Sequence, residues 1–126
     1  MRYLLDTTFA IDFLRGTTEA VHRFERFFSE GDEPYVNEVV MCELAVGFDD
    51  TSDPAFLAFT RAVSFVQPSP QFAVLAGAWR QGARRRGRTL DLADALIAAA
   101  AEGLDARLVT RNARDFALTP AQVETY

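Results

Sequence analysis

Four acidic residues have the types and the spacing to do chemistry together: Asp6, Glu43, Asp94 and Asp115. Each lies at or near the expected end of a strand or on an adjoining helix turn, so the four side chains could converge at one edge of a sheet. Without a counter-ion they would repel one another. Hard oxygen ligands of this kind suit Mg²⁺ or Mn²⁺, which keep several waters and bind substrate phosphate. Because such metals activate water, phosphodiester hydrolysis is the natural reaction class.

Taken singly, three of these acids also have a structural interpretation. Asp6 could cap the helix that follows it, and Asp94 could complement a helix dipole from the first turn. Asp115 alone would be an ordinary loop acid. Glu43 is harder to explain, because it is the only charged residue of a long apolar run. An unpaired carboxylate in such surroundings is costly, so we expect it to have a cation, a partner or a raised pKa.

The elements that would position these acids are short strands that alternate with helices. We expect strands at residues 2–5, 35–36, 65–66, 107–110 and 122–125. Helices are expected at 9–14, 17–28, 38–47, 53–63, 69–86 and 92–101, with a short one at 114–116. This alternation predicts a three-layer α/β/α fold on a mainly parallel sheet of four to five short strands. With no repeat and no long linker, residues 1–126 should form a single domain.

Composition excludes several other classes of protein. No run approaches the ~18–20 apolar residues of a membrane span, and the N-terminus enters the first strand without a leader, which favours a cytoplasmic protein. Cys42 is the only cysteine, so a disulfide framework and a Cys-based zinc site are excluded. His22 is the only histidine, which leaves Ser–His and Cys–His nucleophile systems without convincing members. We expect His22 on the surface and Cys42 packed as a small hydrophobe.

The net charge of −5 argues against a nucleic-acid partner only when it is taken as an average. Residues 1–79 are acidic overall, whereas residues 80–115 carry most of the arginines, and the chain has no lysine. A cluster lies just before the expected Asp94 helix and comprises Arg80, Arg84, Arg85, Arg86 and Arg88. These side chains could be a solvated helix end that complements the dipole. Alternatively, the last four could form a rim beside the acidic site that binds the RNA backbone.

Four segments resemble the successive signature blocks of PIN-domain proteins of the VapC group. They are Leu4–Thr8, Asn37–Gly47, Asp94–Ala99 and Leu108–Phe116, in the right order and over nearly the whole chain. The resemblance implies a PIN-like fold and a metal-dependent endoribonuclease. It assigns Asp6, Glu43, Asp94 and Asp115 as the acidic ligands of Mg²⁺ or Mn²⁺.

The resemblance also implies accessory residues and partners. The polar positions of the family fall on Thr110 and Asn112, which would orient water, metal or carboxylate. Thr8 stands where many relatives carry Asn or Ser, and Asn37 where many carry Ser, so a small polar group is kept at both. A toxin of this group is paired with a VapB-like antitoxin, whose C-terminal segment crosses the active-site groove. A homodimer is expected, with a heterotetramer or a larger assembly once the antitoxin binds.

Two alternatives stay open at this point. The chain could be a non-catalytic PIN-like module for RNA binding or regulation, or a PIN nuclease directed at DNA. Two other protein classes fit poorly. A receiver domain requires a lysine, which this chain lacks, and a haloacid-dehalogenase-like phosphatase requires a second Asp where Thr8 stands. The RNA that is cut, and whether one or two metals act, are not fixed by the sequence.

Overall fold

The computed structural model describes residues 1–126 and is built around one five-stranded sheet. The strands are β1 (Arg2–Leu5), β2 (Glu33–Asn37), β3 (Ser64–Val66), β4 (Arg107–Val109) and β5 (Val123–Glu124). All neighbouring strands are parallel, and their order in the sheet is β3-β2-β1-β4-β5. The order changes direction at β1, and in open parallel sheets ligands bind beyond the carboxyl ends of the strands at such a switch point.

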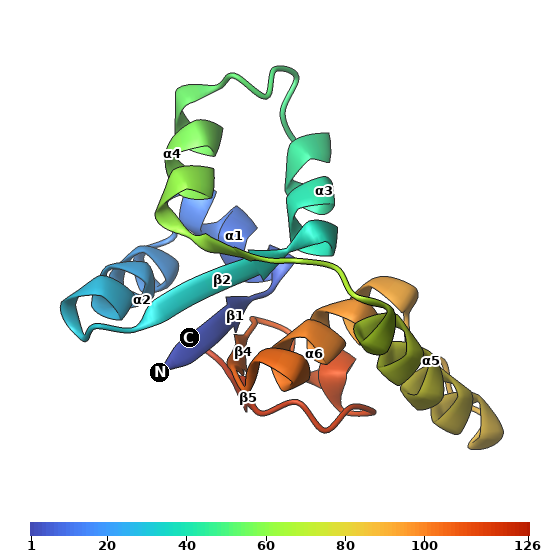
Figure 1. Ribbon diagram of the computed structural model, residues 1–126. Helices are drawn as coiled ribbons and strands as arrows, with labels where there is room; N and C mark the ends of the chain where they lie inside the picture. The colour runs from blue at the N-terminus through green and yellow to red at the C-terminus, as the bar shows by residue number, and fades with distance from the viewer.

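Six α-helices and one 3₁₀ helix connect the strands. They are α1 (Thr7–Leu14), α2 (Thr18–Ser29), α3 (Glu38–Val46), α4 (Pro54–Ala62), α5 (Pro70–Arg85), α6 (Leu92–Leu104) and η1 (Ala113–Phe116). Figure 1 shows α6 on one side of the sheet and α1 and α2 on the other; α3 and α4 stand upright at the top of the view, joined by a loop, and α5 packs alongside α6. The predicted α/β fold with a parallel sheet is therefore confirmed.

The core consists of apolar side chains from both faces of the sheet and from the helices that cover them. Leu4 and Leu5 of β1 are completely buried, and the Tyr3 ring packs at 5.0 Å from that of Phe27 in α2. On the other face α6 supplies mostly alanine, of which Ala98 and Ala101 are fully buried. Small side chains let this helix lie close to the central strands. The central strand and the start of α6 are thereby held in fixed positions.

Several element ends differ from the sequence-based expectation. α6 continues to Leu104 rather than ending at residue 101, and Asp105 closes it in the left-handed conformation, with φ of 54°. β2 begins at Glu33, because the strand pairs with Arg2 of β1 from that residue onwards. Hydrophobic periodicity cannot show such pairing, and sequence-based element boundaries shift by a few residues for that reason.

Two expectations for the surface have opposite outcomes. His22 is exposed, as predicted. The prediction for Cys42 is wrong, because this side chain is exposed on α3 rather than packed. The apolar run that contains it is not buried all round, since Val46 is 84% exposed. No helix of the structure combines the length and the apolar character that crossing a membrane requires.

Candidate active site

Asp6 and Thr110 lie side by side at the carboxyl edge of the sheet. Asp6 directly follows β1 and Thr110 directly follows β4, and the two strands pair in parallel with Leu5 opposite Val109. The backbone N–H of Asp6 donates to the Val109 carbonyl at 2.9 Å, so the pairing of β1 with β4 continues one residue beyond the end of β1. Although Asp6 occupies the N-cap position of α1, its side chain makes no capping bond. Helix capping therefore does not explain this carboxylate.

Two threonine hydroxyls hold the Asp6 carboxylate from one side. The hydroxyls of Thr110 and Thr8 donate to Oδ2 at 2.7 and 2.9 Å, and lie 3.3 Å from each other. Asp6 is only 5% exposed, and Thr110 is completely buried. Because both bonds go to Oδ2, no protein group donates to Oδ1. A carboxylate fixed in this way has one oxygen oriented for an external ligand.

Glu43 comes to the same edge from α3, which begins directly after β2. The hydroxyl of Thr7 donates to its Oε1 at 2.6 Å. The expectation that Glu43 stands in apolar surroundings is wrong, because its side chain is exposed. Burial of one face of α3, through Val40 and Leu44, leaves the rest of the apolar run at the surface. The expected partner is present, and it is a hydroxyl.

Asp94 lies in the first turn of α6, partly buried. Its pKa is raised to about 7, first by burial and then by the negative charges of four neighbours: Asp115, Asp6, Asp91 and Glu43. These neighbours include the three other predicted acids. The four side chains therefore share one region of negative potential, and no basic side chain compensates that potential at Asp94.

Asp115 and Asn112 follow β4 in the chain. Asp115 lies on η1, whose last residue, Phe116, is buried and anchors the turn to the core. The backbone N–H of Asn112 donates to the Thr110 hydroxyl at 3.0 Å, whereas its side chain makes no hydrogen bond and is exposed. Both exposed side chains are free to reorient toward a ligand.

The donor chemistry of this cluster fits a hard divalent cation, although the ligands are not closed around one point. Every candidate ligand is a carboxylate or hydroxyl oxygen, which Mg²⁺ and Mn²⁺ prefer. No three acidic side chains stand close enough as a group to hold an ion. Mg²⁺ usually takes only one or two carboxylates and fills its other positions with water and substrate oxygens. The cluster therefore fits an open site better than a closed cage.

A second set of contacts supports the loop after β4, and sequence reasoning missed it. Asp12 is buried in α1 and accepts a 2.7 Å hydrogen bond from Arg111, the residue between Thr110 and Asn112. Its other oxygen accepts from the Tyr126 hydroxyl. Burial and this bond to Asp12 raise the pKa of Tyr126, which keeps the phenol neutral. No motif indicated these contacts, because the three residues meet only through the fold.

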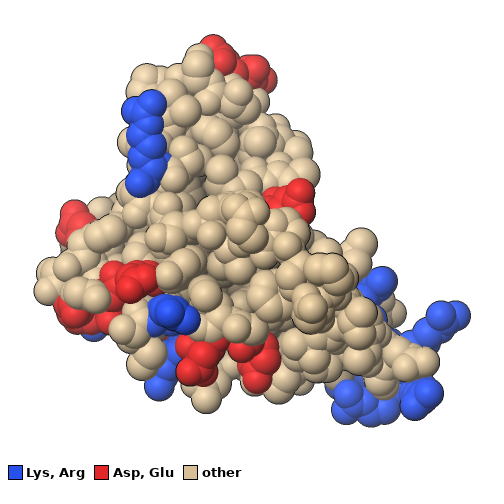
Figure 2. Space-filling view, viewed as in Figure 1, with Lys and Arg blue, Asp and Glu red and all other residues tan.

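The arginine cluster gathers at the far end of α5. Figure 2 shows a concentration of basic side chains where Figure 1 places that end. Arg80, Arg84 and Arg88 line a cavity there, whereas Arg85 and Arg86 do not. None of the five arginines forms an ion pair. Their predicted role at the RNA backbone stays a prediction.

The comparisons with known proteins agree with this fold. The family model of the PIN domain matches residues 3–121. Ribonuclease VapC19 of Mycobacterium tuberculosis is 35% identical over 117 residues, which cover 93% of this chain and 94% of the relative.

Solved structures of toxin–antitoxin complexes contain the same fold. A chain of VapBC2 from Rickettsia felis, bound to a promoter DNA fragment, superposes with a TM-score of 0.88 at 20% identity, over 100% of this chain and 99% of that one. A chain of VapBC-1 from nontypeable Haemophilus influenzae gives 0.82 at 25% identity, over 99% and 98%. A toxin–antitoxin complex from Klebsiella pneumoniae gives 0.74 at 28% identity, over 98% and 96%. The chain belongs to the PIN-domain family and, within it, to the VapC group.

Proposed function

We propose that this protein is a metal-dependent endoribonuclease that acts as the toxin of a VapBC-like toxin–antitoxin pair. One observation carries the proposal: Asp94, at the carboxyl edge of the sheet, has its pKa raised to about 7 by burial and by the charges of Asp115, Asp6 and Glu43. Acidic side chains without a positive partner destabilise the fold through mutual repulsion, but they can hold a cation. These acids lie where the strand order of the sheet changes direction, which is where ligands of such sheets bind. The membership of the VapC group and the ribonuclease relative support the same reaction.

Nucleases of the VapC type depend on a metal, and the cluster fits Mg²⁺ or Mn²⁺ in charge and in donor type. The residues that would hold it are Asp6, Glu43, Asp94 and Asp115. When bound, such a metal supplies a water of lowered pKa and stabilises charge that develops on the phosphate.

The residues of the chain prepare this site in three ways. The Thr110 and Thr8 hydroxyls orient Asp6 through Oδ2, and Thr7 orients Glu43. Asp94 keeps its proton below a pH of about 7 until a cation replaces the proton. Asn112, fixed through its backbone on Thr110, presents an amide that can hydrogen-bond a water or a phosphate oxygen.

The antitoxin assignment has its own support. Two solved relatives with at least 25% identity are described as VapBC-1 and as a toxin–antitoxin complex. In this chain a cavity of about 230 Å³ lies between α1 and α3, with an apolar lining that includes Ile11, Leu14 and Phe48 and with Glu43 at its border. A VapB-like antitoxin segment with apolar side chains and a cation would match it. A homodimer, and a heterotetramer or larger assembly with antitoxin, belong to the same proposal, as does a cytoplasmic location.

The deciding experiment is cleavage of total cellular RNA by the purified, antitoxin-free protein with Mg²⁺ or Mn²⁺. Controls are EDTA and the variants Asp6→Asn and Asp94→Asn, which preserve size while they remove charge. We expect metal-dependent products that disappear in every control. Metal binding without cleavage of any RNA pool would favour a non-catalytic module, and cleavage of DNA alone would favour a DNA-directed nuclease.

A further inference from the structure

We propose that Arg80 and Arg84 form a binding site for a backbone phosphate of the RNA, separate from the acidic cluster. This inference rests on the proposed ribonuclease function and names a second contact with the same substrate. It also divides the arginine cluster, since only part of the cluster would contact the RNA at this site.

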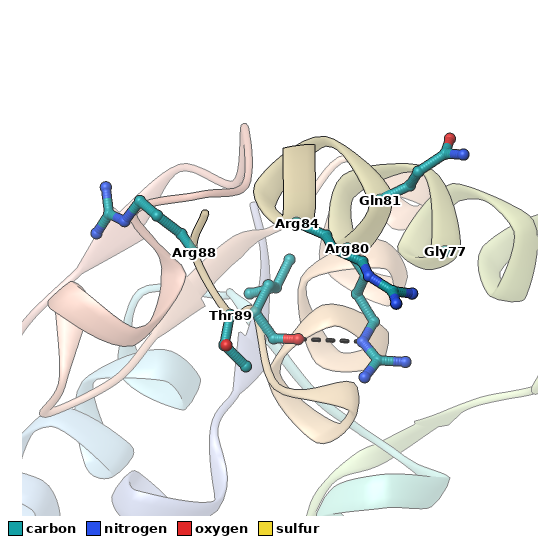
Figure 3. Close-up of a pocket in the computed structure, with 7 residues that line it drawn as sticks. Gly77, Arg80, Gln81, Arg84, Arg88 and Thr89 are labelled. Carbon is teal, nitrogen blue, oxygen red and sulfur yellow. Dashed lines mark hydrogen bonds between the residues drawn. The ribbon is translucent and has the colours of Figure 1, made fainter. Parts of the chain in front are cut away.

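The two arginines border a cavity of about 460 Å³ at the distal half of α5. Gln81 lines it from the same helix, and Thr89 and Arg88 line it from the segment that leads to α6. Figure 3 shows the guanidinium groups of Arg80 and Arg84 side by side, whereas that of Arg88 extends away from this pair. Leu90 is the only hydrophobic residue in the lining. A polar hollow of this size suits a charged group better than an apolar ligand.

Arg80 is held in place before any ligand arrives. Its Nε donates a 3.0 Å hydrogen bond to the backbone carbonyl of Leu90, shown as a dashed line in Figure 3. This bond leaves both terminal nitrogens of the guanidinium without a protein partner. Arg84 lies one helical turn further on and makes no hydrogen bond or ion pair. A fixed guanidinium loses little conformational entropy when it binds, and its planar donors match a phosphate.

The positive charge of the cavity favours an anionic ligand. No acidic residue lines it, so two neighbouring guanidinium groups stand without compensation in a protein of net charge −5. Both positive charges border the same cavity, and a bound phosphate would compensate them. The basic concentration at this end of the molecule is visible in Figure 2. It would attract a polyanion toward a protein that is acidic elsewhere.

The alternative explanation, a solvated helix end, accounts for other members of the cluster. Arg86 donates from Nε to the carbonyl of Gly82 at 3.4 Å and so compensates a free carbonyl in the last turn of α5. Arg85 is exposed in the same turn and does not line the cavity. Arg80 lies more than a turn before the end of the helix, where the dipole has little effect. The helix-end role alone therefore accounts for Arg85 and Arg86, whereas Arg84, which is also in the last turn, lines the cavity as well.

The cavity is joined to the acidic cluster by a short piece of chain. Leu90, whose carbonyl holds Arg80, directly precedes Asp91, the N-cap residue of α6, and Asp94 follows within the first turn. A polynucleotide with one phosphate at Arg80 and Arg84 would run along this segment toward the carboxylates. The occupant that fits both ends is an RNA strand, bound by one phosphate and cut at another.

The test measures RNA binding without cleavage. A fluorescently labelled single-stranded RNA of mixed sequence is titrated with protein in EDTA, over a series of salt concentrations, and binding is measured by fluorescence anisotropy. The variant Arg80→Ala/Arg84→Ala is compared with Arg85→Ala/Arg86→Ala, which loses the same charge. We expect the first pair to weaken binding about tenfold and to lower the salt slope by about 0.7, the value for one phosphate contact of a single strand. The second pair should change both values little.

Because Arg80 also holds the backbone at Leu90, a second comparison uses Arg84→Glu against Arg85→Glu, with thermal melting to check folding. If, in both comparisons, the two variants lost the same RNA affinity, the proposal would be overturned, because the loss would then reflect only the change in net charge. Selective loss of binding to a DNA strand of the same sequence, with RNA unaffected, would also overturn it.

If wild-type protein binds RNA through Arg80 and Arg84 but never cuts it, the cavity is supported and the nuclease proposal fails. If the wild type cleaves RNA but the two double variants bind RNA equally well, the nuclease proposal is supported and the phosphate site at Arg80 and Arg84 fails.

Discussion

The Thr110 hydroxyl donates a 2.7 Å hydrogen bond to Oδ2 of Asp6, although the two residues are 104 positions apart in the sequence. The pairing of β1 with β4 brings them together, since each residue directly follows its strand. The bond is completely buried on the side of Thr110. It occupies Oδ2 of Asp6 and leaves Oδ1 without a protein donor, so the hydroxyl should matter for metal binding as well as for folding.

Replacement of Thr110 by Val should therefore weaken metal binding and RNA cleavage by about 10- to 100-fold, the usual range for a lost partner of a metal ligand. Valine keeps the shape of the side chain and removes the hydroxyl, which donates to Asp6 and also accepts from the Asn112 backbone N–H. Calorimetric titration with Mn²⁺ and cleavage rates with Mg²⁺ would measure the two effects. Thr110→Ser, which restores the hydroxyl, is the control and should recover most of both. Equal losses in the Val and Ser variants would contradict a role for the hydrogen bond.

The raised pKa of Asp94 predicts how stability depends on pH. Burial and the neighbouring acids raise this pKa from 3.8 to about 7 in the folded protein, so between these values the folded state holds a proton that the unfolded chain has released. The free energy of unfolding of the metal-free protein should therefore fall as pH rises from about 4 to about 7. Thermal melting in EDTA across this range would show the fall.

The matched variant for this prediction is Asp94→Asn, which cannot lose a proton. At pH 8 we expect its free energy of unfolding to exceed that of the wild type by on the order of 1–3 kcal/mol, which raises the melting temperature. We also expect its stability to depend less on pH. Adding Mg²⁺ should stabilise only the wild type, because the ion replaces the proton. Parallel pH curves for the two proteins would show that Asp94 does not titrate in this range.

The sheet, and the positions of Asp6 and Asp94 at element ends, can be predicted from the sequence for a simple physical reason. The apolar run at residues 2–5 indicates a strand, and Pro70 and Gly87 indicate where a helix begins and ends. Such patterns depend only on neighbouring residues, so a single sequence is enough to recognise them. Asp6 and Asp94 were placed at element ends, and the carboxyl ends of parallel strands share one edge of the sheet.

Contacts that depend on the packing of distant elements could not be predicted. The apolar run around Glu43 indicated burial, yet α3 buries only one face and leaves that carboxylate exposed. Asp12 gave no signal as an acid inside a helical segment, although it is buried and joins α1 to Arg111. In the arginine cluster the spacing could not separate Arg84, which borders the cavity, from Arg85, which does not.

The contacts of Asp12 lead to a prediction about the loop after β4. Asp12→Ala removes the acceptor for both Arg111 and the Tyr126 hydroxyl, and should lower the free energy of unfolding by about 2–3 kcal/mol. Tyr126→Phe removes one bond only and should cost about 1 kcal/mol. Urea denaturation would measure both. If the two variants were equally stable, the bond to Arg111 would contribute nothing.

The packing of α5 on α6 provides the last prediction. A Cβ on Gly103 would lie 2.0 Å from Cε1 and 2.7 Å from Cζ of Phe72, so the ring would have to leave its position between the two helices. Gly103→Ala should destabilise the protein by about 1–3 kcal/mol, as overpacking of a close-packed contact usually does. The same change at Gly82 meets no atom within 4 Å. Because Gly82 lies within α5, alanine there should stabilise the protein by up to about 1 kcal/mol.

Urea denaturation of the two alanine variants separates packing from helix propensity, because both replace a helical glycine by the same residue. Gly103 lies at the end of α6 opposite to Asp94, so a shift of the helix should also reach the acidic cluster. We therefore expect Gly103→Ala to weaken Mn²⁺ binding and Gly82→Ala to leave it unchanged. A Gly103→Ala protein as stable as the Gly82→Ala protein would mean that Phe72 repacks without cost, and α6 would then be free to move against α5.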